Sequence, residues 1–363
     1  MTDESNKKFD HWVRENDSPA AIVIRENLVP VEGQDGVLFP ATFAASEDKS
    51  FGGGYNIDEF PDGTNVCLID SVGSQANRIE PLFAKKEYAG LVPQLVVKAG
   101  DRRVNLLEAG HRAGDAIIRC SALQDELRKA FKAVQRGDAV PLAKLAPTSI
   151  VFGVWDSRDT QAKLPRLMAS TIRAFNVRSL SRSAQYVPAT EYVESGLLDA
   201  PADKKTKDAY AERGFVHVPA SRSHGGVVAA GDIRRDASLH LAALRLLAAG
   251  EDEAQTLVLR RYILGLAIAA FTYSPSGYLR QGCNLVPDPD KPREFVLVFS
   301  DGRRESATLT HEQALAYAKG TAKAFGGGPD REVMFDKDLA KKDVSGDKGE
   351  SVKKAKGSTK KGQ

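Results

Sequence analysis

The sequence contains few residues whose types and spacing could perform catalysis or bind a metal ion. The metalloprotease pattern HExxH, the serine-hydrolase pattern GxSxG and the phosphate-loop patterns GxGxxG and GxxxxGK(S/T) are all missing. Six histidines are spread along the chain: His11, His111, His217, His224, His240 and His311. No two of them are four residues apart, so no helix face is expected to bind a metal ion through two imidazoles. The sequence predicts neither a metal nor a cofactor.

Two histidines in glycine-containing segments are candidates for acid–base chemistry. His111 lies in a Gly-His-Arg-Ala-Gly-Asp segment, and His224 precedes two glycines. Because imidazole titrates near neutral pH, either side chain could assist RNA cleavage. A structural or RNA-contacting histidine is the simpler interpretation, and Asp156 and Asp159 fit a solvated turn better than a carboxylate pair. We therefore predict that no residue is catalytic and that the chain is not an enzyme.

The clearest charge asymmetry lies between residues 157 and 186. One acid, Asp159, accompanies six bases in this segment: Arg158, Lys163, Arg166, Arg173, Arg178 and Arg182. On a helix predicted over residues 164–175, Arg166 and Arg173 are seven apart and share a face. Such a stripe could neutralise successive phosphates, and arginine also stacks on bases. A solvated helix face is the alternative, but the scarcity of acids favours nucleic acid.

Three further segments are weaker candidates for contacting a nucleic acid. The first is a predicted helix start, whose free backbone amides and polar side chains suit phosphate oxygens: Ser74, Gln75, Asn77 and Arg78. The second is Arg222, close to the glycine pair 225–226, where the backbone could approach a ligand. The third is Arg280, in the polar stretch that follows a long predicted helix.

The composition places these candidates in an ordinary folded protein. The 363 residues are 42% hydrophobic and 27% charged, with a formal net charge of +3. This content suffices for a substantial core, but the net charge alone identifies no partner. The three widely spaced cysteines lack CxxC spacing and indicate reduced thiols. The longest apolar stretch, residues 263–271, is too short to span a bilayer, so we expect a soluble, cytoplasmic protein without membrane contact.

Strand and helix patterns alternate along the chain and must position these residues. Strands are predicted at 66–69, 95–97, 116–118, 150–155 and 295–299, and helices at 123–134, 164–175, 237–249, 251–273 and from Thr310 onward. The segment 177–235 is irregular and predicts an insertion built from a long hairpin. We expect an α+β fold with an N-terminal arm over 1–20, a main domain over 21–335 and a disordered Lys-rich tail over 336–363. An RRM-like sandwich fits this pattern better than a nucleotide-binding sheet.

Four ordered blocks of sequence resemble a known family. They are residues 68–80 (LIDSVGSQANRIE), 111–116 (HRAGDA), 146–157 (APTSIVFGVWDS, continuing to Phe175) and 279–283 (LRQGC). Together they resemble the Cas-seven-type backbone subunit, of the RAMP superfamily, found in type I CRISPR effectors of subtype I-G, formerly I-U. The likeness extends along most of the chain, to about residue 328.

The resemblance implies an RRM-like (ferredoxin-like) palm with an inserted thumb hairpin, for which 177–235 is the candidate segment. Several copies would polymerise along one CRISPR RNA in a Cascade complex and leave its bases free to pair with a target DNA strand. Further partners would be a large subunit and a Cas-five- or Cas-six-type subunit. The matched blocks contain the RNA-binding candidates Gln75, Asn77, Arg78, Lys163, Arg166 and Arg280, whereas Arg178, Arg182 and Arg222 are candidates from charge and location only.

Two alternatives stay open at this point. The chain could be a RAMP-type endoribonuclease that processes CRISPR RNA through His111 or His224. It could also be a general single-stranded nucleic-acid-binding protein outside any CRISPR system. Cleavage of a repeat RNA that is lost in a His→Ala variant would favour the first alternative, and the genes beside this one would test the second.

Overall fold

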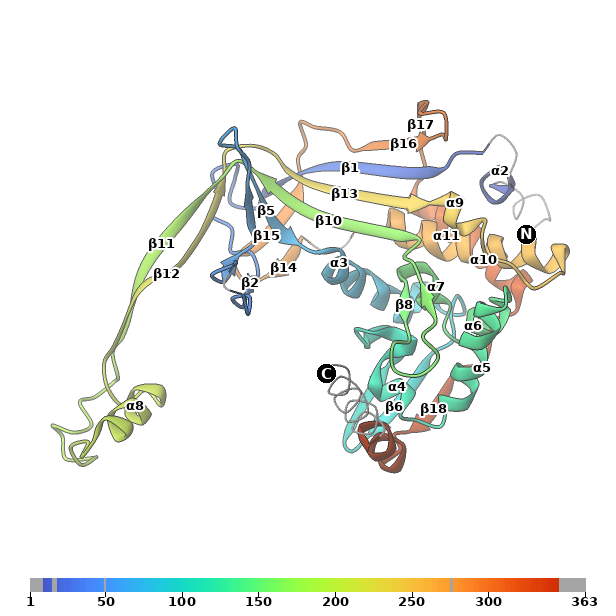
Figure 1. Cartoon of the computed structure of the whole chain (residues 1–363). Coiled ribbons are helices and arrows are strands. Elements are labelled where there is room, and N and C mark those ends of the chain that lie inside the picture. The colour runs from blue at the N-terminus through green and yellow to red at the C-terminus, as the bar shows by residue number, and fades with distance from the viewer. Residues whose placement is uncertain (1–8, 15–17, 49, 275–276, 346–363) are drawn as a thin grey trace, which may run out of the picture.

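The computed structural model describes residues 9–14, 18–48, 50–274 and 277–345, and it has a mixed α+β architecture around one curled antiparallel sheet (Figure 1). The strands of this sheet follow the order β14-β15-β1-β13-β10-β5-β4, with β16 beside β1 and β17 beside β16. Their bounds are β14 Tyr278–Arg280, β15 Cys283–Pro287, β1 Ala21–Pro30, β13 Ile233–His240, β10 Met168–Phe175, β5 Asn65–Asp70, β4 Ile57–Glu59, β16 Glu294–Val298 and β17 Arg304–Ser306.

The four central strands are connected in a defined topology. In chain order, β1, β10, β13 and β16 are the first to fourth of these strands, and their spatial order is β16-β1-β13-β10. Each neighbouring pair is antiparallel. The connection from β1 to β10 contains α3 to α7, and the connection from β13 to β16 contains α10. The fourth strand therefore lies beside the first, and the third lies between the first and the second.

Alternation along the central strands gives the sheet one covered and one open face. In β1, Ile22, Ile24 and Leu28 are buried, whereas Val23 and Arg25 between them are partly or fully exposed. A strand directs successive side chains to opposite faces, so this pattern buries one face only. On the buried face, Glu26 pairs with Arg235 of β13 at 2.8 Å, and this ion pair lies between two hydrophobic cores.

Helices cover the buried face (Figure 1). The labelled α-helices of the described residues are α2 Asp10–Val13, α3 Val72–Ile79, α4 Ala116–Arg119, α5 Gln124–Gln135, α6 Val140–Leu145, α7 Pro147–Phe152, α8 Lys204–Glu212, α9 Leu241–Leu244, α10 Glu253–Thr272 and α11 His311–Phe325. Helix α10 packs along α11 and supplies much of the larger core. By length and composition α10 could cross a membrane, but 61% of its apolar window is buried inside the fold, as in the core helix of a globular domain.

A smaller three-stranded sheet, β18-β6-β7, lies below the helices in Figure 1. Its strands are β6 Leu95–Ala99, β7 Arg102–Asn105 and β18 Arg331–Met334, and β18 runs parallel to β6. Short 3-10 helices lead into and out of this region: η1 Glu80–Ala84, η2 Lys86–Tyr88, η3 Leu106–Glu108 and η4 Arg112–Gly114. Two small hairpins complete the fold, with strands β2 Thr42–Phe43, β3 Gly54–Tyr55, β8 Val154–Trp155 and β9 Lys163–Leu164.

A long two-stranded hairpin projects from one end of the main sheet (Figure 1). It consists of β11 Val177–Tyr186 and β12 Val218–Ala229 and is inserted between β10 and β13. Helix α8, at its far end, has no buried residue. The structure thus contains the long hairpin that the sequence predicts, and the last part of the predicted 177–235 segment, from Ile233, belongs to the main sheet instead.

Several local predictions are confirmed. Strand β5 leads directly into α3, whose N-cap Ser71 accepts a hydrogen bond from the Ser74 amide. The helix predicted from Thr310 onward is α11, which a capping box at Thr310 opens and Gly326, with φ of +69°, ends. Helix α10 and strand β16 also occur where the sequence predicts a helix over 251–273 and a strand over 295–299.

Other predictions of secondary structure are wrong. Residues 168–175 form a central strand because their buried positions alternate and both neighbours pair with them. Residues 147–152 form α7, since Pro147 suits the first helical turn and Gly153, with φ of +79°, stops the helix. Residues 116–119 form α4, and the predicted 237–249 helix is replaced by the end of β13 and the short α9.

The chain ends also differ in part from the prediction. Phe9, Trp12 and Val13 of the predicted N-terminal arm are buried in the larger core. In the predicted disordered tail, residues 337–345 are helical, and Asp343 pairs with Arg119 at 2.7 Å. Residues 346–363 lie outside the part of the chain that the structure describes.

Candidate nucleic-acid interface

A buried carboxylate at the end of β5 organises the strongest candidate site. The side chain of Asp70 is fully buried and accepts hydrogen bonds from four donors. Ser74 Oγ and Gln75 Nε2, both from the first turns of α3, donate at 2.8 and 2.7 Å. Arg78 Nε donates at 3.2 Å from the same helix, and Arg280 donates at 2.8 Å from β14. We call these five residues the Asp70 cluster.

The Asp70 cluster carries a local excess of positive charge. Its two guanidinium groups face one carboxylate, so one positive charge stays uncompensated within the group. The side chains of Arg78 and Arg280 are 30% and 25% exposed. A second donation from Arg280, to the Ile69 carbonyl at 2.9 Å, fixes its direction. Guanidinium groups held in this way can present their outer N–H groups to a phosphate without losing much side-chain entropy.

The residues predicted to contact RNA at the start of α3 differ in exposure: Gln75 is inside the fold and Asn77 is at the surface. Gln75 is fully buried, and its amide oxygen accepts from Ser170 at 3.0 Å. It therefore supports Asp70 and cannot contact RNA as the sequence predicts. Asn77 is exposed and accepts from Arg112 at 3.4 Å. Arg112 is itself buried against Glu80 at 2.7 Å, and burial raises the pKa of Glu80 to about 7.

The predicted arginine stripe is not present. Arg166 lies in the loop between β9 and β10, with its backbone against Gly153, whereas Arg173 lies within β10. No helix exists here that could place these two side chains on one face. Lys163 and Trp155 are paired across the β8–β9 hairpin, and the exposed Arg158 lies in its turn. The bases of this segment therefore belong to two different surfaces.

The remaining predicted bases lie on the open face of the sheet and on the long hairpin. Arg173 lies beside Arg234 of the neighbouring strand. Arg178 and Arg182 are exposed on β11, and the Arg182 guanidinium lies over the Phe39 ring at 5.7 Å. Arg222 belongs to β12, but its side chain lies outside the part that the structure describes.

The two candidate catalytic histidines lie in different surroundings. The exposed His111 donates its backbone amide to Asp115 at 3.2 Å. The His224 ring packs against Tyr55, with ring centroids 5.1 Å apart, and covers Gly54. The described residues contain no group of three or more His, Cys, Asp or Glu side chains that could hold a metal ion.

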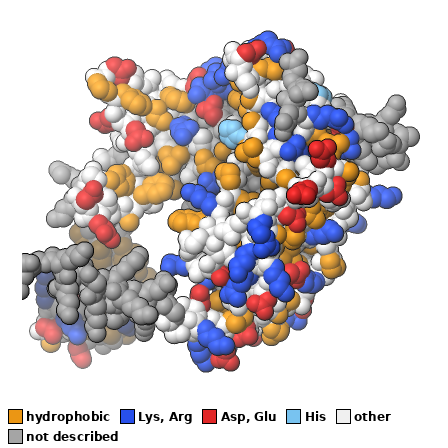
Figure 2. Space-filling view, turned by 45° about the vertical axis from the view of Figure 1, so that its right-hand side comes forward, with side chains coloured by type: hydrophobic (Ala, Val, Ile, Leu, Met, Phe, Trp, Pro, Cys, Tyr) orange, Lys and Arg blue, Asp and Glu red, His pale blue; other side chains and the backbone are white. Residues whose placement is uncertain are grey.

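One face of the molecule shows how the other charges are distributed. In Figure 2, Lys and Arg side chains are interspersed with Asp and Glu side chains. This mixture agrees with the totals of 51 basic and 48 acidic residues. The long-range electrostatic field of the whole chain is therefore weak. Any attraction of a polyanion depends on local groups such as the Asp70 cluster.

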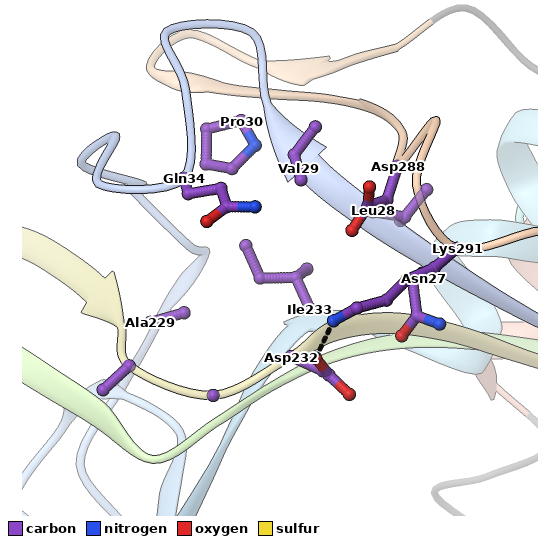
Figure 3. A pocket seen from close by; sticks show the side chains of 12 residues that line it. Asn27, Leu28, Val29, Pro30, Gln34, Ala229, Asp232, Ile233, Asp288 and Lys291 are labelled. Carbon is purple, nitrogen blue, oxygen red and sulfur yellow. Dashed lines mark hydrogen bonds and ion pairs between the residues drawn. The ribbon is translucent and has the colours of Figure 1, made fainter.

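A small pocket lies between the end of β1 and the β12–β13 turn (Figure 3). Its volume is about 240 Å³, and Leu28 and Ile233 contribute apolar walls. The Lys291 ammonium pairs with Asp232 at 2.7 Å across one side. Because this lysine is already paired with a carboxylate, the pocket offers less to an anion than the Asp70 cluster does.

Sequence reasoning identified the bases of the cluster but not its centre. Asp70 lies in the 68–80 block, directly after the predicted strand 66–69, and this position is a recognisable signal for a functional or organising carboxylate. Trp155 lies in the 146–157 block, where the sequence alone assigns it no role. Arg280 is 210 residues from Asp70, so only the folded sheet, in which β14 continues beyond β15, shows that the two side chains meet.

Comparison with known proteins relates part of the chain to a described family. No curated protein matches the sequence. Residues 22–179 match the family model described as CRISPR-associated protein GSU0053. The matched segment, less than half of the chain, contains Asp70, helix α3 and the β8–β9 hairpin. This match indicates a CRISPR-associated protein family.

Proposed function

We propose that the chain is a guide-RNA-binding scaffold subunit of a type I CRISPR surveillance complex, of the Cas-seven type in subtype I-G. Several copies would polymerise along one CRISPR RNA and present it for pairing with target DNA. The large subunit and a Cas-five- or Cas-six-type subunit would complete the complex in the cytoplasm. In this role the chain binds and positions RNA, and it needs no catalytic residue or cofactor of its own.

The topology of the sheet supports this proposal. The spatial order β16-β1-β13-β10, with helical connections after the first and third strands in the chain, is the order expected of a ferredoxin-like, RRM-like palm. The long β11–β12 hairpin is inserted between the second and third strands, where a thumb would be. The match to a CRISPR-associated family supplies the biological context.

The observation that carries the proposal is the Asp70 cluster. A scaffold that accepts many guide sequences must bind the sugar-phosphate backbone, because base contacts would discriminate between guides. Two arginines fixed on one buried carboxylate provide such a contact, since they offer N–H donors and surplus positive charge without a pocket for a base. Asn77 continues the polar surface from the same helix.

The decisive experiment is to express the chain with a CRISPR array and the neighbouring genes, purify it, and sequence the RNA that accompanies it. We expect uniform guide-length RNA that carries repeat and spacer. A random mixture of RNA would support a general single-strand binder. Cleavage of repeat RNA by the chain alone, lost on His111→Ala or His224→Ala, would support an endoribonuclease instead.

A charge-matched pair of variants connects the result to the site. Arg78→Gln with Arg280→Gln removes two bases from the cluster, whereas Arg303→Gln with Arg304→Gln removes two exposed bases of the β16–β17 turn. For single strands, each lost phosphate contact should reduce the salt slope of log K by about 0.7. We expect this reduction only for the cluster variant. Equal slopes in the two variants would exclude the Asp70 cluster as a phosphate contact.

A further inference from the structure

The chain has two tryptophans, and their surroundings are opposite. Trp12 is 4% exposed within the larger core, where it stacks on Phe9. Trp155, in the β8–β9 hairpin, is 57% exposed. Leaving a large aromatic ring in water forfeits the stabilisation that its burial would supply. An exposed ring on an ordered element is therefore available to a ligand that covers it.

The hairpin that carries Trp155 is firmly anchored. Val154 and Leu164, which form the neighbouring cross-strand pair, are both buried in the larger core. The Asp156 carboxylate is buried and accepts from the Thr160 hydroxyl at 2.6 Å, which closes the turn. Alternation from the buried Val154 directs Trp155 outward. The ring is therefore presented by a rigid element, and binding to it requires little ordering of the chain.

The charges around the ring favour an anionic ligand. The Lys163 ammonium lies over the Trp155 ring, 5.5 Å from its centre, in a cation–π contact. The two acids of the hairpin do not compete with it, because Asp156 is turned inward and Asp159 pairs with Arg128 at 2.6 Å. An aromatic ring beside an unopposed cation suits a nucleotide, which has a flat base and a negative phosphate.

The hairpin and helix α3, which carries Arg78 of the Asp70 cluster, both contact the η4 turn. A Cβ at Gly114 would lie 3.1 Å from the Trp155 carbonyl oxygen, so the η4 turn packs directly on the hairpin. The same turn contains Arg112, whose guanidinium reaches Asn77 of α3 at 3.4 Å. Asn77 and Arg78 are consecutive residues of that helix. The hairpin and the helix that carries Asn77 and Arg78 therefore pack against the same turn, η4.

We propose that Trp155 and Lys163 form a stacking site for one unpaired base of a single-stranded nucleic acid. Trp155 receives the base on its ring, and Lys163 binds the adjoining phosphate. This inference rests on the proposed RNA-binding function and adds a contact that the phosphate-binding cluster does not supply. Stacking tolerates any base because every base has a π-face, so the site is compatible with guides of many sequences.

Intrinsic fluorescence tests the contact directly, because Trp155 is the exposed tryptophan and Trp12 is buried. The full chain is titrated with single-stranded RNA and, separately, with an abasic oligonucleotide of the same length. We expect RNA to quench the emission and to protect it from iodide, and we expect the abasic strand to do neither. Trp155→Phe removes the exposed fluorophore, so the RNA-dependent change in emission should disappear, while the phenylalanine ring can still stack on a base.

Affinity measurements on matched variants complete the test. Trp155→Ala should weaken RNA binding about 5- to 100-fold, the range for loss of one aromatic–base stack. Trp155→Phe should retain most of the affinity, and neither variant should change binding of the abasic strand. The control is Leu246→Ala, which truncates an apolar side chain that is 83% exposed on the α9–α10 connection.

The outcomes separate this inference from the function on which it rests. The stacking site alone would be overturned if the wild-type chain binds RNA without a change in its tryptophan emission and Trp155→Ala binds RNA with an unchanged Kd. If Trp155→Ala changes self-association, measured by sedimentation, but leaves the RNA affinity unchanged, the ring belongs to a protein interface. That result would also overturn the stacking site. Failure of the wild-type chain to bind RNA would overturn the proposed function and this inference together.

Discussion

Replacing Asp70 by Asn should damage the fold far more than its small chemical change suggests. The Asp70 carboxylate is fully buried and accepts hydrogen bonds from Ser74, Gln75, Arg78 and Arg280. An Asn side chain keeps one acceptor oxygen but turns an N–H₂ group toward the other donors. The variant therefore loses the charge that holds two guanidinium groups together and leaves the buried Gln75 amide without its acceptor.

The expected cost follows from the burial of each partner. Removing one member of a fully buried ion pair costs about 3–5 kcal/mol. Arg78 and Arg280 are 30% and 25% exposed, so they can turn toward water, which lowers this figure. The unsatisfied Gln75 amide adds about 1–3 kcal/mol. We expect Asp70→Asn to reduce the free energy of unfolding by about 3 kcal/mol, a large fraction of the 5–15 kcal/mol typical of a domain.

Urea denaturation followed by circular dichroism measures this loss. With a slope of about 3 kcal/mol per M, the midpoint should fall by about 1 M. Asp236→Asn is the matched control, because Asp236 also contacts two arginines, Arg25 and Arg234, but is 29% exposed on the open face. That variant should lose about 0–1 kcal/mol. Equal losses in the two variants would refute the organising role of Asp70.

Two further predictions concern reactivity and modularity. Burial raises the pKa of Cys67 to about 12 and of Cys283 to about 11, and it also raises the pKa of Cys120. All three thiols therefore stay protonated and covered at pH 8. Ellman's reagent should react with none of them in the native chain and with all three after unfolding in guanidinium. A fast reaction with the native chain would contradict their burial. Replacing 187–217 by a two-residue turn between the paired ends of β11 and β12 should change the unfolding midpoint little, because α8 has no buried residue; a midpoint loss above about 0.5 M urea would show that the tip supports the core.

Secondary structure was predictable where local signals determine it. The helix predicted from Thr310 onward is confirmed as α11, because the capping box at Thr310 and the left-handed Gly326 each act within one helical turn. Ser71 caps α3 in the same local way. The segment 164–175 was misassigned because its residues satisfy both a helical and an alternating pattern. Pairing with β5 and β13 on either side decides in favour of the strand, and a single sequence does not contain that information.

The candidate site was predictable only in part for the same reason. Ser74, Gln75 and Arg78 are close in sequence, so the polar start of α3 could be recognised from its spacing. The contact of Arg280 with Asp70 depends on β14 continuing the edge of the sheet, and no local pattern indicates it. The sequence shows the aromatic Trp155, but its exposure depends on whether Trp155 or the adjacent Val154 faces the core.

The charge distribution also explains why polymerisation matters for the proposed function. The acids and bases of the chain nearly balance, and the arginines once assigned to a single stripe lie on separate surfaces. In the proposed scaffold, each copy would therefore neutralise few phosphates, and the electrostatic part of its affinity for RNA would be small. Copies that bind side by side on one strand combine these weak contacts, because each bound neighbour raises the effective concentration of the next. The proposed scaffold would therefore bind its guide tightly as an assembly and only weakly as a single chain.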